Sequence, residues 1–354
     1  SRALRQPIMS SKKSAKQKGA SKTTRSPKKS PKRKSSDISD FVNTASSSTP
    51  SKPKIAEAYP THLDFQQGSF FSYIILGILI RIISALINPV SDCDETYNYW
   101  EPTAYLITNY GFQTWEYAPQ YALRSYSYLL PQYAIGTALK SLPLVQSSPF
   151  LIFYAIRIIL SLTCLCCEYY FCQSLQIWFD RRTAFLTFIF LIFSSGMFNC
   201  CAAYLPQQFV LCTILLSFGS FFRGRQLTAV LFMGIAAIIG WPFIALLAVP
   251  MAIDCMATMG LLTFLLYVIL FAVGLCGICI GVDFVYYGKV VLAPLNIFIY
   301  NLAVSGSAEG NDEEQQGQNL YGVDDWTYYV KNLLFNWNVV FLLALCAPLM
   351  TNLI

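Results

Sequence analysis

Long apolar segments recur along most of this chain, behind a polar stretch at its N-terminus. A helix needs about 20 mostly apolar residues to cross a bilayer, and several of these segments reach that length. The first begins only near Gly68, so it does not have the form of a cleaved signal peptide. The pattern predicts an all-α, polytopic membrane protein. The apolar segments are residues 69–89, 148–177, 183–203, 207–222, 226–258, 259–282 and 333–354.

Two segments depart from the pattern of a simple span. The run 226–258 contains Gly240-Trp241-Pro242, and proline breaks the hydrogen-bond ladder of a helix, so we expect two short helices there. Residues 124–147 contain two prolines and two basic residues. They fit an interfacial or re-entrant helix better than a clean span.

The charge divides the chain into two parts. Residues 1–64 hold 15 Lys and Arg and 4 Asp and Glu, a net charge of +11, whereas residues 65–354 hold 10 and 15, a net charge of −5. The first part is rich in Ser, Lys and Pro, so we predict a disordered basic tail ahead of a multi-span membrane domain at 65–354. A basic segment beside a first span stays cytoplasmic, and the polar loops at about 90–123 and 283–332 then share the lumenal side if both halves of 226–258 cross. Arg181-Arg182 and Arg223 with Arg225 are also expected on the cytoplasmic side.

The first polar loop is dense in acidic and aromatic side chains. Carboxylates set among aromatic rings at a membrane boundary can have a raised proton affinity, which suits proton abstraction, and aromatic rings suit the faces of sugars. Asp92 and Glu95 have the spacing of a capping box for a helix beginning near residue 93, so helix capping and interface anchoring explain the loop somewhat better than catalysis does. Asp94 is not needed by that box and is the first candidate for a base. The candidate residues are Asp92, Asp94, Glu95, Trp100, Glu101, Trp115, Glu116 and Tyr117.

The positions of the histidine and the cysteines in the sequence exclude several other kinds of site. The single histidine, His62, lies in the predicted cytoplasmic approach to the first span, so the polar loops lack a histidine for a catalytic triad or a metal site. Eleven of the 12 cysteines lie in or beside apolar segments, including the pairs Cys164/Cys167 and Cys276/Cys279. We interpret these as small packing residues and predict no metal-binding residues. A carboxylate remains as the candidate base.

Arg124 and Lys289 are the candidate cations of the two loops. If the site must hold a phosphate, they are the expected donors of charge-assisted hydrogen bonds. Anchoring of the helices by snorkelling at the membrane interface explains them equally well. The acidic, Gly- and Gln-rich stretch around 305–319 is expected to be a solvated insertion.

Five segments carry a resemblance to a known family: SDCDETYNYWEP from Ser91, GFQTWEYAPQYALRSY from Gly111, SSGMFNCCAAYLPQQF at 194–209, GWPFIALLAVP at 240–250 and VDFVYYGKVVLAPLNIFIYN at 282–301. They resemble the dolichyl-phosphate-mannose-dependent α-1,2-mannosyltransferases of N-glycan precursor assembly in the endoplasmic reticulum. The resemblance covers most of residues 80–340. It implies a GT-C helical bundle with its active site on lumenal loop helices.

The resemblance also implies a reaction and its partners. Mannose would pass from dolichyl phosphate mannose to a dolichol-linked oligosaccharide in α-1,2 linkage, with inversion because the donor is β-linked. Asp94 would deprotonate the acceptor, Glu95 is the second candidate for that role, and Arg124 and Lys289 would face the donor phosphate. No cofactor is implied, and a metal requirement stays open. The lipid bilayer is the third partner.

The chain departs from the family in two places. Relatives have a Glu-Pro-Trp segment with a Phe-Tyr pair where this chain reads Asp324-Asp325-Trp326-Thr327-Tyr328-Tyr329, so the proline is missing. The family continues through further spans where this chain stops at Ile354, so we expect a C-terminally truncated form and leave its activity open.

Three other functions compete with this interpretation. A transporter would use charged residues within its spans. Few are present in or beside the apolar segments: Arg81, Arg157, Glu168 and Asp254. A transporter also often contains an internal repeat, and the sequence has none. Another GT-C mannosyltransferase, such as one of GPI-anchor synthesis, is disfavoured by the stretch TWEYAPQYALRSY. The basic tail could bind nucleic acid, but a cytoplasmic segment that fixes orientation explains it more simply, so no nucleic acid is expected.

Overall fold

The computed structural model describes residues 67–146, 150–303 and 324–351. Within them the chain is helical and has no strand, which confirms the predicted all-α class. The predicted disordered tail at 1–64 and the acidic stretch around 305–319 lie outside the described residues. The helices are α2 (Gln67–Ile87), α3 (Glu101–Thr108), α4 (Leu130–Lys140), α5 (Pro143–Gln146), α6 (Phe150–Trp178), α7 (Arg181–Phe193), α8 (Ser195–Cys200), α9 (Pro206–Phe222), α10 (Gln226–Ile235), α11 (Val249–Met259), α12 (Leu261–Tyr287), α13 (Ala293–Ala303) and α14 (Trp326–Thr351).

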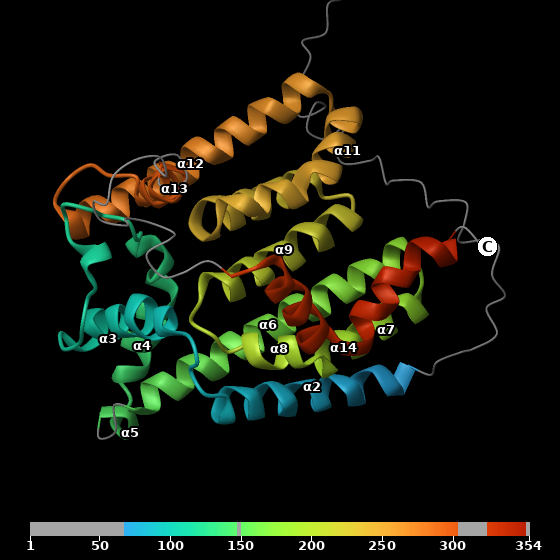
Figure 1. Cartoon of the computed structure of the whole chain (residues 1–354), viewed down its shortest axis with the longest axis horizontal. Helices are drawn as coiled ribbons and strands as arrows, with labels where there is room; N and C mark the ends of the chain where they lie inside the picture. The colour runs from blue at the N-terminus through green and yellow to red at the C-terminus, as the bar shows by residue number, and fades with distance from the viewer. Residues whose placement is uncertain (1–66, 147–149, 304–323, 352–354) are drawn as a thin grey trace, which may run out of the picture. The chain divides into compact units, whose positions relative to one another are not determined.

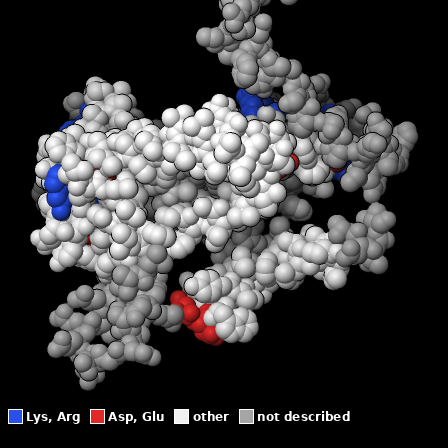
Figure 2. Space-filling model, turned by 90° about the horizontal axis from the view of Figure 1, so that it is seen from above, with Lys and Arg blue, Asp and Glu red and all other residues white. Residues whose placement is uncertain are grey.

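Several helices are suited to a bilayer. Within the described residues, four are long and apolar enough to cross a membrane: Phe150–Trp178, Pro242–Met259, Leu261–Tyr287 and Trp326–Leu349. Large apolar side chains lie exposed along α12, including Leu262 and Val285, and Figure 2 shows a face on which charged side chains form only small patches. Such a surface is stable only against lipid or another apolar partner. The predicted polytopic membrane architecture is therefore confirmed.

The expected break in the run 226–258 is present. The helix that begins at Gln226 ends in a π-helical turn, Ala236–Gly240, and Trp241 has an extended backbone. A 3₁₀ turn at Pro242–Ala248 then leads into α11. Gln226 donates its side-chain amide to the hydroxyl of Thr258 at 2.5 Å, so the two halves form a hairpin. The break lies at the closed end of that hairpin.

A second break, at Ser194, was not expected from the sequence. The apolar run 183–203 is divided between α7 and α8, and the extended Ser194 caps α8 by accepting the Met197 amide at 3.3 Å. The predicted non-spanning character of 124–147 is confirmed, because α4 has 11 residues and such a helix is too short to cross a bilayer.

The polar and basic loops lie at opposite ends of the helices. At the beginning of α6, Phe153 packs against Trp100 of the first polar loop. Near its end, Ser174 accepts a hydrogen bond from Arg223 at 2.7 Å. Figure 1 shows α3, α4 and α13 gathered toward one end and the turn from α11 into α12 at the other. This separation is what the positive-inside pattern requires.

Candidate active site

The first polar loop forms a short helix whose beginning the sequence predicts. Asp92 accepts the backbone N–H of Asp94 at 2.8 Å and so caps a helix that begins at Cys93. The expectation that Glu95 completes the capping box is wrong. Glu95 points inward, is 6% exposed, and accepts the N–H of Tyr204 at 3.0 Å. Glu95 therefore ties this helix to the segment between α8 and α9.

A cavity of about 720 Å³ opens beside this helix. It is lined from three separate parts of the chain: the first polar loop, the break at Trp241, and α13 of the second polar loop. The two polar loops thus meet at one cavity, as the sequence predicts if 226–258 forms a hairpin. The lining residues are Asp92, Cys93, Asp94, Tyr97, Asn98, Phe112, Thr114, Trp115, Glu116, Leu123, Arg124, Trp241, Ile297, Tyr300 and Asn301.

Asp94 is the carboxylate best placed to act as a base in this cavity. Its side chain is 51% exposed, and its second oxygen lies 3.6 Å from a guanidinium nitrogen of Arg124. Asn98 donates its amide to the other oxygen at 3.0 Å. Partial burial raises the pKa of Asp94, with the nearby carboxylates of Glu116 and Asp92 acting in the same direction and Arg124 opposing them. A carboxylate with raised proton affinity suits general-base catalysis.

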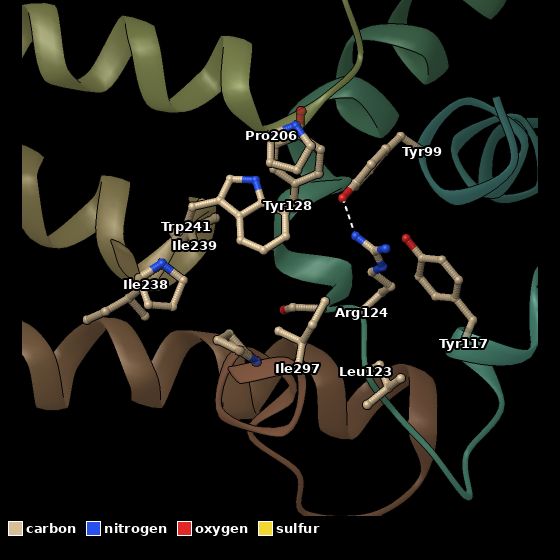
Figure 3. Close-up of a pocket in the computed structure, with 14 residues that line it drawn as sticks. Tyr99, Tyr117, Leu123, Arg124, Tyr128, Pro206, Ile238, Ile239, Trp241 and Ile297 are labelled. Carbon is tan, nitrogen blue, oxygen red and sulfur yellow. Dashed lines mark hydrogen bonds between the residues drawn. The ribbon is translucent and has the colours of Figure 1, made fainter. Parts of the chain in front are cut away.

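Arg124 joins the charged groups of the site. Its guanidinium group donates to the carboxylate of Glu116 and to the hydroxyl of Tyr99, and it lies 5.4 Å from the centre of the Tyr99 ring. Figure 3 shows this group between Tyr99 and Tyr117, with Trp241 on the far side of a second, narrow cavity of about 50 Å³. Leu123, Arg124, Trp241 and Ile297 line both cavities. The larger cavity, called the polar cavity below, also holds the carboxylates of Asp92, Asp94 and Glu116, which the narrow one lacks.

Asn98 organises the hydrogen bonds of the polar cavity, and it was not among the site residues predicted from the sequence. Besides donating to Asp94, its amide lies 3.4 Å from Glu116, and its side-chain oxygen accepts the hydroxyl of Thr114 at 2.7 Å. Its backbone carbonyl accepts the hydroxyl of the buried Tyr117 at 2.7 Å. The sequence could have indicated Asn98 as a site residue, because it follows Asp94 by four residues and such pairs lie on one face of a helix. Trp241, Ile297, Tyr300 and Asn301 were also missed as lining residues.

Comparison with known proteins identifies the family of the chain. Residues 72–354 match the Alg9-like mannosyltransferase family. The chain belongs to this family. It is 40% identical over 270 residues to the protein named alpha-1,2-mannosyltransferase ALG9 in Mus musculus. This alignment covers 75% of this chain and 42% of the relative. It is 38% identical over 285 residues to the Homo sapiens protein of that name, an alignment that covers 77% of this chain and 43% of the relative. It is 30% identical over 292 residues to the Saccharomyces cerevisiae protein, where 75% of this chain and 48% of the relative are covered.

The chain spans less than half the length of these relatives. No solved structure is significantly similar to it. The family membership and the identities confirm the resemblance seen in the sequence.

Of the other predicted site residues of this Alg9-like chain, some line the cavity and others do not. Trp115 lines the polar cavity and packs edge-on against Tyr121. Trp100 packs against Phe153 and Tyr204, outside both cavities. Glu101 accepts the N–H of Phe112 at 3.1 Å. Lys289 is exposed after α12 and lines neither cavity. Its predicted contact with a phosphate remains a prediction.

Metal-ligating side chains come together at one place within the described residues. The ligand atoms of Asp92, Cys93 and Asp94 lie within 4.8 Å of one another, and the group is largely exposed. Hard cations such as Mg²⁺ prefer six oxygen ligands, and a thiol does not suit them. Asp92 is also occupied as a helix cap. The predicted absence of a metal from this Alg9-like site stays a prediction.

Proposed function

We propose that the chain carries the active site of an inverting α-1,2-mannosyltransferase. The observation that carries the proposal is the cavity where Asp94 and Arg124 meet and to which both polar loops contribute. Membership of the Alg9-like family and the names of the relatives supply the sugar and the linkage. The donor would be dolichyl phosphate mannose and the acceptor a dolichol-linked oligosaccharide, in the membrane of the endoplasmic reticulum.

The proposed reaction is a single displacement. Asp94 takes the proton of an acceptor hydroxyl, whose oxygen attacks C1 of mannose while the bond from C1 to the phosphate oxygen breaks. Dolichyl phosphate leaves with that electron pair, and the configuration at C1 inverts. One base and no protein nucleophile suffice, which agrees with the absence of histidine from 65–354. Arg124 stabilises the charge of the departing phosphate through its guanidinium group.

The neighbours of Asp94 favour it over Glu95 as the base. Glu95 is buried, receives the N–H of Tyr204, and lines neither of the two cavities. Asp94 opens into the polar cavity with half of its side chain exposed. An acceptor hydroxyl can therefore approach Asp94 without unfolding of the loop helix.

The transporter alternative finds little support in the charges within the helices. Arg81 and Glu168 are both fully buried and form an ion pair at 2.6 Å. Arg157 donates to the backbone carbonyl of Asn88 at 2.9 Å. These contacts give the charged groups structural partners, whereas an ion pathway requires groups that can exchange partners.

The deciding experiment measures mannose transfer by Asp94→Asn in membranes supplied with dolichyl phosphate mannose and a lipid-linked acceptor. We expect loss of transfer by a factor of about 10² or more, because general-base catalysis contributes on that order. Asp254→Asn is the matched control, since Asp254 is an exposed carboxylate on α11 that lines neither cavity. An Asp94→Asn chain that is inserted and transfers mannose at the wild-type rate would remove Asp94 as the base. Solute uptake by the wild type without any transfer would favour a transporter.

A further inference from the structure

The backbone that carries Arg124 is irregular and has a costly conformation. Ala122 has a positive φ of 45°, a region that residues with a Cβ rarely adopt. Such a conformation costs about 1 kcal/mol or more and persists only when its surroundings fix it. The segment from Ala122 to Tyr126 has to be held by contacts from elsewhere in the molecule.

Three side chains from α12 and α13 supply those contacts. The fully buried Asp283 accepts the N–H of Tyr126 at 2.8 Å and the hydroxyl of Ser125 at 3.0 Å, both at one oxygen. Tyr287, one turn later, donates its hydroxyl to the backbone carbonyl of Arg124 at 2.6 Å. Asn296 of α13 donates to the carbonyl of Ala122 at 3.0 Å. These four hydrogen bonds reach the chain at Ala122, Arg124, Ser125 and Tyr126.

We propose that Asp283, Tyr287 and Asn296 are positioning residues that hold Arg124 against Asp94 and Glu116. They touch the backbone of residues 122–126 and line neither cavity, so they act through Arg124 and not on a substrate. The inference rests on the proposed function, because that function makes Arg124 a site residue. It gives the segment VDFVYYGKVVLAPLNIFIYN a role that does not depend on Lys289.

Loosening the contacts that hold Arg124 near Asp94 would change the pKa of Asp94. The groups that face Asp94 are Asp92, which caps its helix, Glu116, Arg124 and the amide of Asn98. Of these, Arg124 is the cation, and its attraction opposes the burial that raises the pKa of Asp94. Withdrawal of Arg124 would raise that pKa further. A base must be ionised to act, so the acid limb of the pH–rate profile would move to higher pH.

Tyr287→Phe tests the proposal because it removes one hydroxyl and keeps the ring. Tyr286→Phe is the matched control, since Tyr286 stacks on Tyr126 but has no hydrogen bond to Arg124. Two measurements are made on the purified full chain: the rate of trypsin cleavage after Arg124, relative to cleavage after the exposed Arg182, and the pH profile of mannose transfer. A net hydrogen bond of about 1 kcal/mol predicts about fivefold faster cleavage after Arg124 in Tyr287→Phe. The acid limb is expected at higher pH in the same variant.

A second pair of variants separates positioning from simple loss of folding. Asp283→Asn keeps an oxygen that accepts from Tyr126 and Ser125, and should behave like the wild type in both measurements. Asp283→Ala removes that oxygen and should accelerate cleavage after Arg124 at least as much as Tyr287→Phe.

Two results would overturn the proposal. The first is equal cleavage after Arg124 in Tyr287→Phe and Tyr286→Phe, and the second is faster cleavage with an unmoved acid limb. If the wild-type chain transfers no mannose, the proposed function fails, and the trypsin comparison still decides whether Tyr287 and Asp283 hold Arg124.

Discussion

At the scale of single residues, the site depends on how one cation is shared. Arg124 bonds directly to Glu116 and Tyr99, and it reaches Asp94 only at 3.6 Å. The Coulomb attraction falls with distance and is screened at an exposed group, so Arg124 neutralises Glu116 more fully than Asp94. Glu116 thereby serves to orient the guanidinium group. Asp94 keeps a side chain that is half exposed to the cavity, as the proposed base requires.

The pH dependence of transfer should therefore respond to a charge next to Asp94. Asp92 raises the pKa of Asp94 by like-charge repulsion. Asp92→Asn removes that charge, and asparagine caps helices as well as aspartate does, so the loop helix should persist. The pKa of Asp94 falls, and the acid limb of the rate profile is expected at lower pH, as measured by transfer between pH 4 and 8. Asp254→Asn should leave the limb in place. Movement to higher pH in Asp92→Asn would contradict the assignment of Asp94 as base.

The sequence could predict those residues of the site whose partners are close along the chain. The spacing of Asp92 and Glu95 located the start of the helix, because capping is a local interaction. The inward turn of Glu95 depends on the N–H of Tyr204, 109 residues away, and no local pattern encodes that contact. The same holds for Asp283, whose partners Ser125 and Tyr126 follow the first polar loop and lie more than 150 residues away along the chain.

At the scale of helices, breaks in apolar runs shape the site. Gly240 precedes the break at Trp241, and a Cβ built there would lie 2.2 Å from Cγ2 of Val210 in α9. The break could be predicted because glycine and proline flank Trp241. The break at Ser194 could not, because no glycine or proline precedes it and its stabilising contacts are remote. Arg81 of α2 donates there to the carbonyls of Leu191 at 3.1 Å and Met197 at 3.3 Å.

Gly240→Ala should destabilise the chain by about 1–3 kcal/mol, because overpacking forces α9 and the hairpin apart. Thermal unfolding in detergent measures this as a lower midpoint. Adding Val210→Ala should restore much of the loss, since it removes the methyl group that the new Cβ meets. Gly274→Ala on α12 is the control, with no heavy atom within 4 Å of its Cβ position. An equal effect of the two alanine substitutions would show that packing against α9 is not the cause.

The buried ion pair between α2 and α6 gives a second prediction at this scale. Arg81 and Glu168 are fully buried and lie 2.6 Å apart. Removing one partner strands the other charge, so Glu168→Leu should cost about 3–5 kcal/mol, whereas Arg81→Met with Glu168→Leu should lose much less. The comparison of unfolding midpoints for the single and double variants checks this. A double variant no more stable than the single one would mean that the pair itself, and not the stranded charge, governs stability.

At the scale of the whole membrane domain, the helices bring distant polar loops to one cavity. The first loop, the break at Trp241 and α13 all line it, and the basic residues around Arg182 and Arg223 lie beyond the other ends of the helices. The charge pattern could predict this separation, because basic loops and acidic loops alternate with the apolar runs. The depth and lining of the cavity could not be predicted, since they depend on the packing of α13 against the first loop.

The two ends of the helices should face different compartments, and a native thiol reports on one of them. Cys93 is exposed and lines the cavity. In sealed vesicles of endoplasmic reticulum with their cytoplasmic face outward, a membrane-impermeant maleimide should leave Cys93 unlabelled until detergent opens the vesicles. Cys93→Ser identifies its signal among the other thiols. Arg182→Cys places a thiol at the opposite end and should be labelled in intact vesicles. Labelling of Cys93 in intact vesicles would put the cavity on the cytoplasmic side, where the proposed lumenal acceptor could not reach Asp94.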